Sequence, residues 1–162
     1  MFPAVADAIA CLGAIAHELN SRMRSEARSC LLVPDHLQFA AYPPSRIKGK
    51  YKPHRDNYWD SSQRMRANDR DVTCIFYLND GWAECDGGQL RLHPEARLAD
   101  DETLLRSWSG GHRGSGGAGP YVDVTPSAGR VAIFRSELLH EVLPNLSQRW
   151  RYALTMWVVT VV

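Results

Sequence analysis

The first part of the chain alternates apolar and polar residues with the period of an amphipathic helix. Apolar side chains recur every three or four positions, at Val5, Ile9, Leu12, Ile15, Leu19 and Met23. This spacing places them on one face of a helix over about residues 4–24. It is the only convincing helix in the sequence, and we expect its apolar face to pack against the rest of the protein.

After this helix the pattern changes to short apolar or alternating runs, which are typical of β-strands. The runs lie at residues 37–41, 72–78, 89–92, 121–124, 131–134 and 150–162. Turn-forming sequences such as NDG, CDGG and PSAG separate them. Several short strands with turns between them predict a mainly β fold, either a sandwich, a barrel or a jelly roll, with the helix packed on the sheet.

Two polar segments, residues 58–70 and 107–120, interrupt the strands, and we predict that both are mobile surface loops. The second contains Gly114, Gly116 and Gly119, which formally match G-x-G-x-x-G. A dinucleotide-binding turn needs a strand before this motif and a helix after it. The sequence offers neither, so the motif does not indicate a nucleotide site.

Composition limits the class of protein. With 162 residues, of which 44% are hydrophobic and 23% charged, the chain should fold as a single domain over residues 1–162. Nineteen basic against eighteen acidic residues give a net charge of +1, so we expect no nucleic-acid partner. No apolar run reaches the roughly 18 residues of a membrane-spanning helix, so we expect no membrane partner. The sequence does not indicate the oligomeric state.

The cysteines give the expected compartment. Cys11, Cys30, Cys74 and Cys85 form no C-x-x-C pair, which fits neither a zinc ribbon nor a dense disulfide framework. We predict that they are reduced packing residues. The expected location is therefore the cytoplasm, or the nucleus if the source is eukaryotic.

The most informative short motif is His54-x-Asp56 in the segment YKPHRDN. In an extended segment, residues two apart point to the same side, so the imidazole and the carboxylate converge. By itself the pair is better explained as a surface histidine beside a solvated aspartate, because H-x-D often occurs by chance. His140 follows the apolar run 131–139, and a core strand could deliver it to the same point. Two histidines and one carboxylate leave three positions of an octahedral metal open, as in non-haem Fe(II) oxygenases.

The last predicted strand carries a second polar feature. Alternation places Arg151, Ala153, Thr155 and Trp157 on one face and the apolar residues between them on the other. An arginine buried in a strand is costly unless it meets an anion. The anion is either an internal carboxylate or an acidic ligand, and the pattern alone does not decide between them.

Five motifs in a fixed order carry a family resemblance. They are HxD, VTCIFYLN, GGQLRLHP, HEVLP and RYALTMW, within about Phe39 to Trp157. This order resembles the 2-oxoglutarate and Fe(II)-dependent prolyl hydroxylases, and most closely the subgroup that hydroxylates the hypoxia-inducible factor in animals. The resemblance implies a double-stranded β-helix fold. It also implies Fe(II), 2-oxoglutarate, O2 and ascorbate as cofactors, and a protein or peptide substrate whose target proline becomes 4-hydroxyproline, with succinate and CO2 as co-products.

The same resemblance implies roles for individual residues. The iron ligands would be His54, Asp56 and His140. The group that binds 2-oxoglutarate or lines its pocket would be Arg151, Tyr77, Thr155, Tyr42, Ile75 and Leu90, with Tyr42 close to the metal. Arg70 would lie near the substrate entrance, and Trp157 would form a wall of the cavity. Arg149 competes with Arg151, but Arg151 begins the RYALTMW match and Arg149 precedes the strand.

The sequence also departs from the family. Family members have helices and strands before the predicted first helix, so the chain is expected to be a fragment or a minimal version. Both polar segments look longer than in the hypoxia-type pattern, so the substrate of that subgroup cannot be assigned to this chain from the resemblance. The alternatives are the same chemistry on a collagen-like repeat, a translation protein or a free amino acid. A truncated non-catalytic β-helix module and a zinc-binding cupin-like sensor are the rivals from other classes.

The remaining histidines and tryptophans have no such motif. We expect surface positions for His17, His36, His93 and His112. Trp59, Trp82 and Trp108 lie near loops, where they could stack on a peptide proline, although partial burial is the simpler interpretation.

Overall fold

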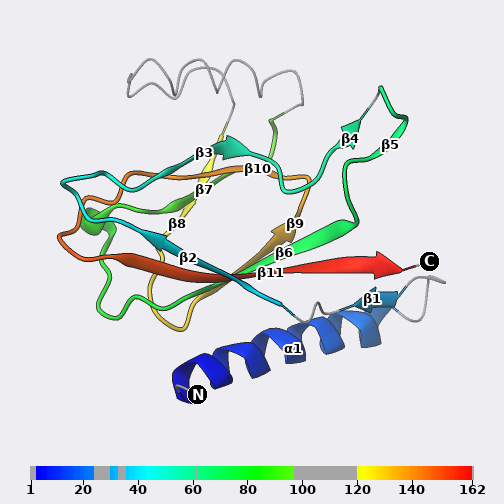
Figure 1. Ribbon diagram of the computed structural model, residues 1–162, viewed down its shortest axis with the longest axis horizontal. Helices are drawn as coiled ribbons and strands as arrows, with labels where there is room; N and C mark the ends of the chain where they lie inside the picture. Colours follow the sequence, from blue (N-terminus) through cyan, green and yellow to red (C-terminus); the bar gives the residue numbers. More distant parts are fainter. Residues whose placement is uncertain (1–2, 24–29, 33–35, 61, 97–119, 162) are drawn as a thin grey trace.

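Two larger antiparallel β-sheets, a two-stranded hairpin and one long helix are the main elements of the described part of the chain (Figure 1). The structure is a computed structural model that describes residues 3–23, 30–32, 36–60, 62–96 and 120–161. The glycine-rich motif, Trp108 and His112 lie outside these residues, as does almost all of the predicted loop 107–120. Among the described residues, no helix combines the length and the apolar composition that a membrane crossing needs.

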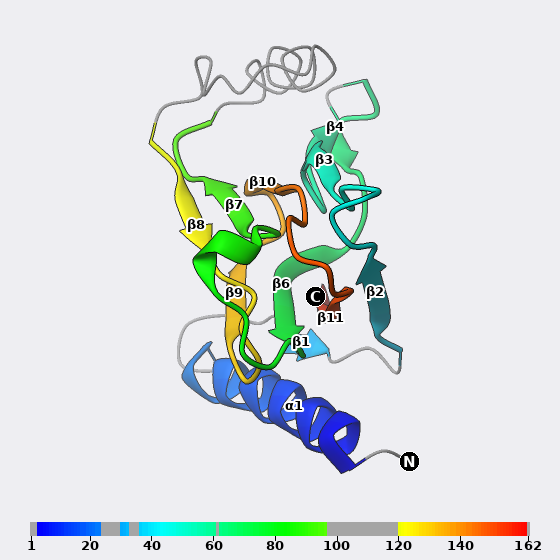
Figure 2. The ribbon, with the colours of Figure 1, turned by 90° about the vertical axis from the view of Figure 1, so that its left-hand side faces the viewer.

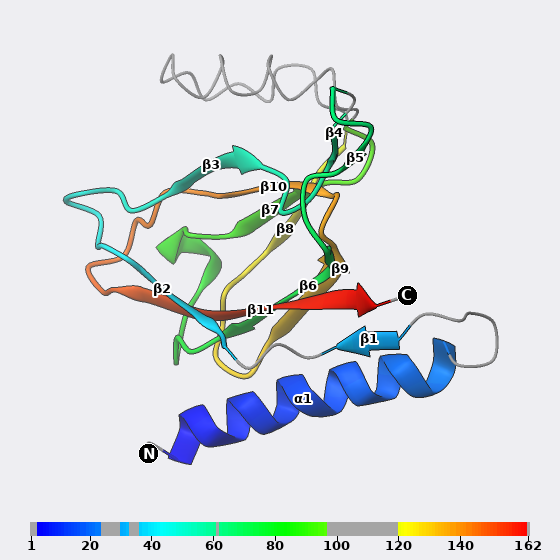
Figure 3. The same ribbon diagram turned by 45° about the vertical axis from the view of Figure 1, so that its right-hand side comes forward.

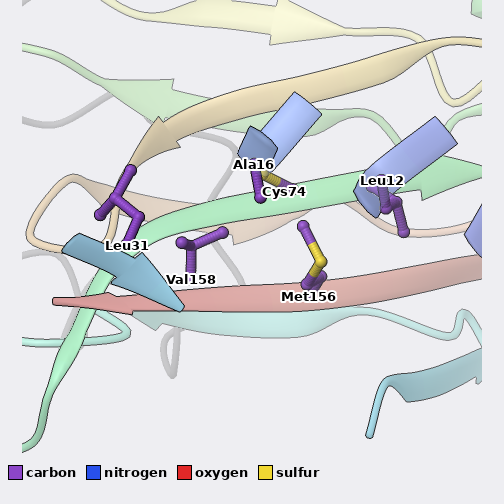
Figure 4. Close-up of a cluster of buried hydrophobic side chains, with 6 residues drawn as sticks. All are labelled: Leu12, Ala16, Leu31, Cys74, Met156 and Val158. Atoms are coloured by element: carbon purple, nitrogen blue, oxygen red, sulfur yellow. The ribbon is translucent and has the colours of Figure 1, made fainter. Parts of the chain in front are cut away.

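The helix α1 spans Pro3–Met23, which confirms the predicted helix to within a residue at each end. Leu12 and Ala16 are fully buried against the sheet, and Ile15 and Leu19 pack around them. Figure 4 shows this cluster, in which the two helix residues meet Leu31, Cys74, Met156 and Val158. Ile9 is 46% exposed, so the sheet does not cover the apolar face of the helix at this residue.

The larger sheet, here the major sheet, has five strands: β1 (Cys30–Leu32), β2 (Gln38–Tyr42), β6 (Arg70–Tyr77), β9 (Val131–Arg135) and β11 (Arg151–Val161). Their order is β1-β11-β6-β9, and β2 pairs with the first half of β11. β1 pairs with the end of β11, directly above α1 (Figure 3). The long strand β11 therefore organises the sheet.

The smaller sheet, here the minor sheet, has the order β3-β10-β7-β8. Its strands are β3 (Tyr51–His54), β7 (Leu90–His93), β8 (Val122–Val124) and β10 (Leu139–Val142). A 3-10 helix, η1 (Glu84–Asp86), precedes β7. In Figure 2 the minor sheet and α1 lie on opposite sides of the major sheet. A second apolar cluster fills the space between the sheets, formed by Ile75, Tyr77, Leu90, Ala132, Phe134 and Ala153. Two facing antiparallel sheets with a helix on one of them confirm the predicted fold class.

The segment 58–70, predicted as a surface loop, is largely exposed but contains regular structure that the prediction missed. β4 (Trp59–Asp60) and β5 (Met65–Arg66) form a two-stranded hairpin there. Asp60 accepts hydrogen bonds from the backbone of Ser62 and Gln63 in the turn. Such local side-chain bonds stabilise a hairpin without an apolar pattern, which is why the sequence pattern missed it.

Two expectations about single residues are also wrong. His93 is 4% exposed in β7, where its Nε2 lies 3.2 Å from Glu141 Oε1, so it is not a surface residue. Cys11 and Cys85 are exposed free thiols rather than packing residues. Cys74 does pack between the helix and the sheet, and burial raises the pKa of its thiol to about 11.

Candidate active site

A pocket of about 440 Å³ opens between the two sheets. All the predicted metal, cofactor and substrate residues line it except Tyr77, which is buried behind Arg151. The lining residues that the sequence did not single out for the site are Gln38, Ala40, Ala41, Tyr51, Arg55, Val142 and Ala153. Side chains from six strands thus meet in one cavity.

At one end of the pocket, His54, Asp56 and His140 bring their ligand atoms within 4.8 Å of one another. β3 and β10 are antiparallel neighbours in which His54 pairs directly with His140. Asp56 follows β3 by two residues, and its oxygens lie 3.7 Å from His54 Nε2 and 3.6 Å from His140 Nε2. Strand pairing therefore brings together two histidines that lie 86 residues apart in the sequence.

Both imidazoles are oriented for a metal. His54 Nδ1 lies 2.9 Å from the carbonyl of Lys52, and His140 Nδ1 lies 2.8 Å from the carbonyl of Leu138. A carbonyl only accepts, so each Nδ1 carries a proton, and each Nε2 is the ring nitrogen that faces Asp56. Burial lowers the pKa of His140 to about 4, with His54 adding to the effect. His140 is thus neutral at pH 7, as a metal ligand must be.

Asp56 is a buried carboxylate, with a side chain that is 7% exposed. Among the described residues, the two histidines are the only groups that approach it as ion-pair partners. Its Oδ2 accepts a hydrogen bond from Thr73 Oγ1 at 2.7 Å. A carboxylate held this way beside two imidazoles fits a divalent cation, which would supply the missing positive charge.

A guanidinium lies in the same pocket. Arg151 begins β11, is 2% exposed, and donates from Nε to the carbonyl of Gly88 at 2.7 Å. No carboxylate in the described part of the chain forms an ion pair with it. Burial lowers the pKa of Arg151, which expresses the cost of holding this charge away from water. The unpaired, planar guanidinium fits a carboxylate ligand.

Two tyrosines surround the guanidinium. Tyr42 lies opposite Arg151 in the β2–β11 pairing, with its ring 4.7 Å from the guanidinium carbon, and the Tyr77 ring lies at 5.3 Å. The buried Tyr77 hydroxyl has no hydrogen-bond partner among the described residues. Burial raises the pKa of Tyr77 to about 12, so its hydroxyl keeps a proton that it can donate to an anion beside Arg151.

Arg149 lies outside the pocket. It donates to the carbonyls of Asp80 and Gly81 and lies 3.5 Å from Asp86 Oδ2. Its side chain is 52% exposed. Of the two candidate arginines, only Arg151 faces the cavity.

Arg70 and Trp157 also line the pocket. Arg70 begins β6, and its guanidinium carbon lies 3.8 Å from the centre of the Trp157 ring. The indole Nε1 of Trp157 is buried without a hydrogen-bond partner among the described residues. The two side chains thus stack on each other, and the indole N–H of Trp157 is a hydrogen-bond donor without an acceptor among the described residues.

Gly88 supports Arg151 and yields a prediction. Gly88 has φ +68°, and a Cβ there would lie 2.9 Å from Arg151 Cδ. Gly129 also has a positive φ, but a Cβ there would meet nothing within 4 Å. Gly129→Ala should cost about 1–2 kcal/mol from backbone strain alone. Gly88→Ala should cost at least as much and should also displace Arg151.

The resemblance described above implies that Arg151 binds 2-oxoglutarate, and the affinity for this acid separates the two effects. For Gly88→Ala we expect an affinity for 2-oxoglutarate lower by roughly tenfold, about 1.4 kcal/mol, and for Gly129→Ala an unchanged affinity. Thermal denaturation and calorimetric titration with 2-oxoglutarate measure the two quantities. Equal affinities in the two variants would show that Gly88 does not position Arg151.

Comparison with known proteins identifies the family. A model of the 2OG-Fe(II) oxygenase superfamily matches residues 37–159, and the chain belongs to this superfamily. Egl nine homolog 1 of Rattus norvegicus is 34% identical over 110 residues, which are 66% of this chain and 24% of that protein. The chain thus spans about a quarter of the length of this relative.

Two solved structures are also similar. A Pseudomonas putida prolyl-4-hydroxylase has a TM-score of 0.51 and 35% identity, over 76% of this chain and 51% of that one. A prolyl hydroxylase from Trichoplax adhaerens, in complex with a peptide fragment of the hypoxia inducible factor oxygen degradation domain, has a TM-score of 0.62 and 27% identity. That match covers 94% of this chain and 56% of that chain. The fold of these neighbours agrees with the jelly roll described above.

Proposed function

We propose that the protein is an Fe(II)- and 2-oxoglutarate-dependent dioxygenase that hydroxylates a prolyl residue of a protein substrate to 4-hydroxyproline. One observation carries the proposal. A buried carboxylate beside two imidazoles and a buried, unpaired guanidinium line one cavity of about 440 Å³. This arrangement fits a metal at one end and the carboxylate of a small acid at the other.

In this proposal His54, Asp56 and His140 hold Fe(II) and leave three of its positions open. Arg151 and the Tyr77 hydroxyl bind the distal carboxylate of 2-oxoglutarate, with Thr155 on the same face of β11. Ile75 and Leu90 line the pocket and exclude water. With 2-oxoglutarate and O2, the iron supplies an oxidant able to hydroxylate a C–H bond, with succinate and CO2 as co-products.

The substrate half of the proposal is supported by the pocket mouth and by the relatives. Arg70 and Trp157 are stacked on each other beside the pocket, and Trp157 has a free indole N–H. An aromatic side chain that lines the pocket can pack on a proline ring. Tyr42, the last residue of β2, lines the same pocket as the proposed metal ligands. Ascorbate would keep the iron reduced.

The test is cosubstrate turnover with matched peptides. The purified protein is incubated with Fe(II), 2-oxoglutarate, ascorbate and O2, and succinate is measured. The first peptide is the oxygen degradation domain fragment bound by the Trichoplax relative, and its control has alanine in place of the target proline. We expect succinate to require Fe(II), and the proline peptide alone to gain one oxygen atom.

Each result has a distinct meaning. If succinate forms but no peptide in a panel of proline peptides is oxidised, the proposal of a prolyl substrate is contradicted. The proposal that the protein is a 2-oxoglutarate-dependent oxygenase would still stand. No succinate from folded, iron-loaded protein with any peptide would contradict the proposed enzyme and favour a binding module. Amino-acid analysis of the oxidised peptide distinguishes 4-hydroxyproline from other isomers.

A further inference from the structure

Behind the proposed metal site lies a pair of buried hydroxyl groups, on Thr73 and Ser136, that no motif assigned to a function. Both residues are 0% exposed. We infer that Thr73, supported by Ser136, is a positioning residue that fixes the carboxylate of Asp56 for one-oxygen binding to the metal. The inference rests on the proposed function, because it concerns the ligand role of Asp56.

The hydrogen bonds of this group have a defined direction. Thr73 Oγ1 lies 2.7 Å from Asp56 Oδ2 and 3.0 Å from Ser136 Oγ. An ionised carboxylate only accepts, so Thr73 gives its single proton to Asp56. Ser136 must then donate to Thr73, which makes a chain from Ser136 through Thr73 to the carboxylate. Each bond in such a chain polarises the next one.

Rigid backbone holds both ends of this chain. Thr73 lies inside β6, where it pairs with Phe134 of β9 and Trp157 of β11. The backbone N–H of Ser136 donates to the carbonyl of Asp71, and its carbonyl accepts from the N–H of Asn57, next to Asp56. The hydroxyl pair and the backbone that carries Asp56 therefore move together.

The bond from Thr73 affects how many metal positions stay open. Thr73 donates to Asp56 Oδ2, which also lies 3.6 Å from His140 Nε2. Oδ1 accepts no hydrogen bond from the described residues and lies 3.7 Å from His54 Nε2. A carboxylate that binds through both oxygens takes two positions of an octahedral metal, whereas one oxygen leaves three open beside two histidines. The chelating cosubstrate and O2 together need three. Thr73 thus favours the binding mode that the proposed chemistry requires.

The test measures metal affinity in the absence of turnover. Mn(II) is a suitable probe because it accepts the same imidazole and carboxylate ligands. Thr73→Val keeps the shape of the side chain and removes its hydroxyl, and it should weaken Mn(II) binding about 10–100-fold. Thr73→Ser restores the hydroxyl and should bind close to wild type. Ser136→Ala removes only the far end of the chain and should have an intermediate effect.

Thr160→Val is the matched control, since Thr160 pairs with Leu31 at the far end of β11, and its Mn(II) affinity should not change. The melting temperature of each metal-free variant is measured in parallel. If Thr73→Val does not fold, the test compares the Mn(II) affinities of the other two variants. Thr73→Ser should then bind Mn(II) more tightly than Ser136→Ala. An unchanged affinity in Thr73→Val, or an equal loss in Thr73→Ser, would overturn the inference. No Mn(II) binding by wild type would instead contradict the proposed function.

Discussion

Replacing Arg151 by methionine is expected to raise the melting temperature of the ligand-free protein and to abolish its stabilisation by 2-oxoglutarate. The charge of Arg151 is almost fully buried, and no carboxylate in the described part of the chain pairs with it. Replacing buried charges by apolar residues of similar volume often stabilises a protein by about 1–4 kcal/mol. The lost bond to Gly88 offsets about 1 kcal/mol of this gain.

The two measurements separate stability from binding. For a protein of this size, 1 kcal/mol corresponds to roughly 2–4 °C in melting temperature, so we expect a rise of a few degrees. In wild type, 2-oxoglutarate at about 100 times its dissociation constant should add roughly 2.7 kcal/mol, with Mn(II) present as the inert metal. The variant should gain nothing from the cosubstrate.

Arg149→Met is the matched control for this prediction. Arg149 is exposed and holds the loop carbonyls of Asp80 and Gly81. Its replacement should lower the melting temperature slightly and leave the response to 2-oxoglutarate intact. The reverse pattern, with the response lost in Arg149→Met and kept in Arg151→Met, would show that the other arginine binds the cosubstrate.

His140→Ala is expected to reduce succinate formation to background. Removing an outer-shell partner of a metal ligand typically costs about 10–100-fold in affinity or activity, and the loss of a ligand should exceed this. His140 is 3% exposed and pairs with His54, so no neighbouring group or bulk water can replace it with the same geometry. Turnover and the Mn(II) dissociation constant are both measured.

His17→Ala serves as the control because His17 is an exposed histidine on α1. It should retain turnover and metal binding. Circular dichroism checks that His140→Ala remains folded. Wild-type Mn(II) affinity in a folded His140→Ala protein would remove His140 from the proposed ligand set.

The pattern of apolar residues predicted the fold where elements are long. α1 and β11 each repeat their pattern over several turns or pleats, and both were predicted to within a residue or two. The strands β3 and β10 were not predicted as strands. Each has four residues, and His54, His140 and Glu141 interrupt the apolar alternation. The polar residues proposed for the active site therefore disrupt the apolar pattern by which β3 and β10 could have been predicted as strands.

The site was predictable where a motif exists. The HxD pair and the arginine that heads β11 were found from the sequence, and the structure brings them to one pocket. Thr73 lies in the VTCIFYLN motif but was given no role there, and Ser136 lies in none of the five motifs. A signal for Thr73 was nevertheless present, because it shares the face of Ile75 and Tyr77, where a polar residue in an apolar series needs a buried partner. No pattern in the sequence pointed to Ser136.

The two faces of β11 restrict how this chain can vary in length. Arg151, Thr155 and Trp157 face the pocket, while Met156 and Val158 pack under α1. Inserting or deleting one residue between Arg151 and Trp157 would exchange the two faces, placing pocket side chains under the helix and core side chains in the cavity. Length changes in β11 are therefore tolerated only in pairs. Related genes should show their gaps in the loops on either side, such as residues 143–150, rather than within this strand.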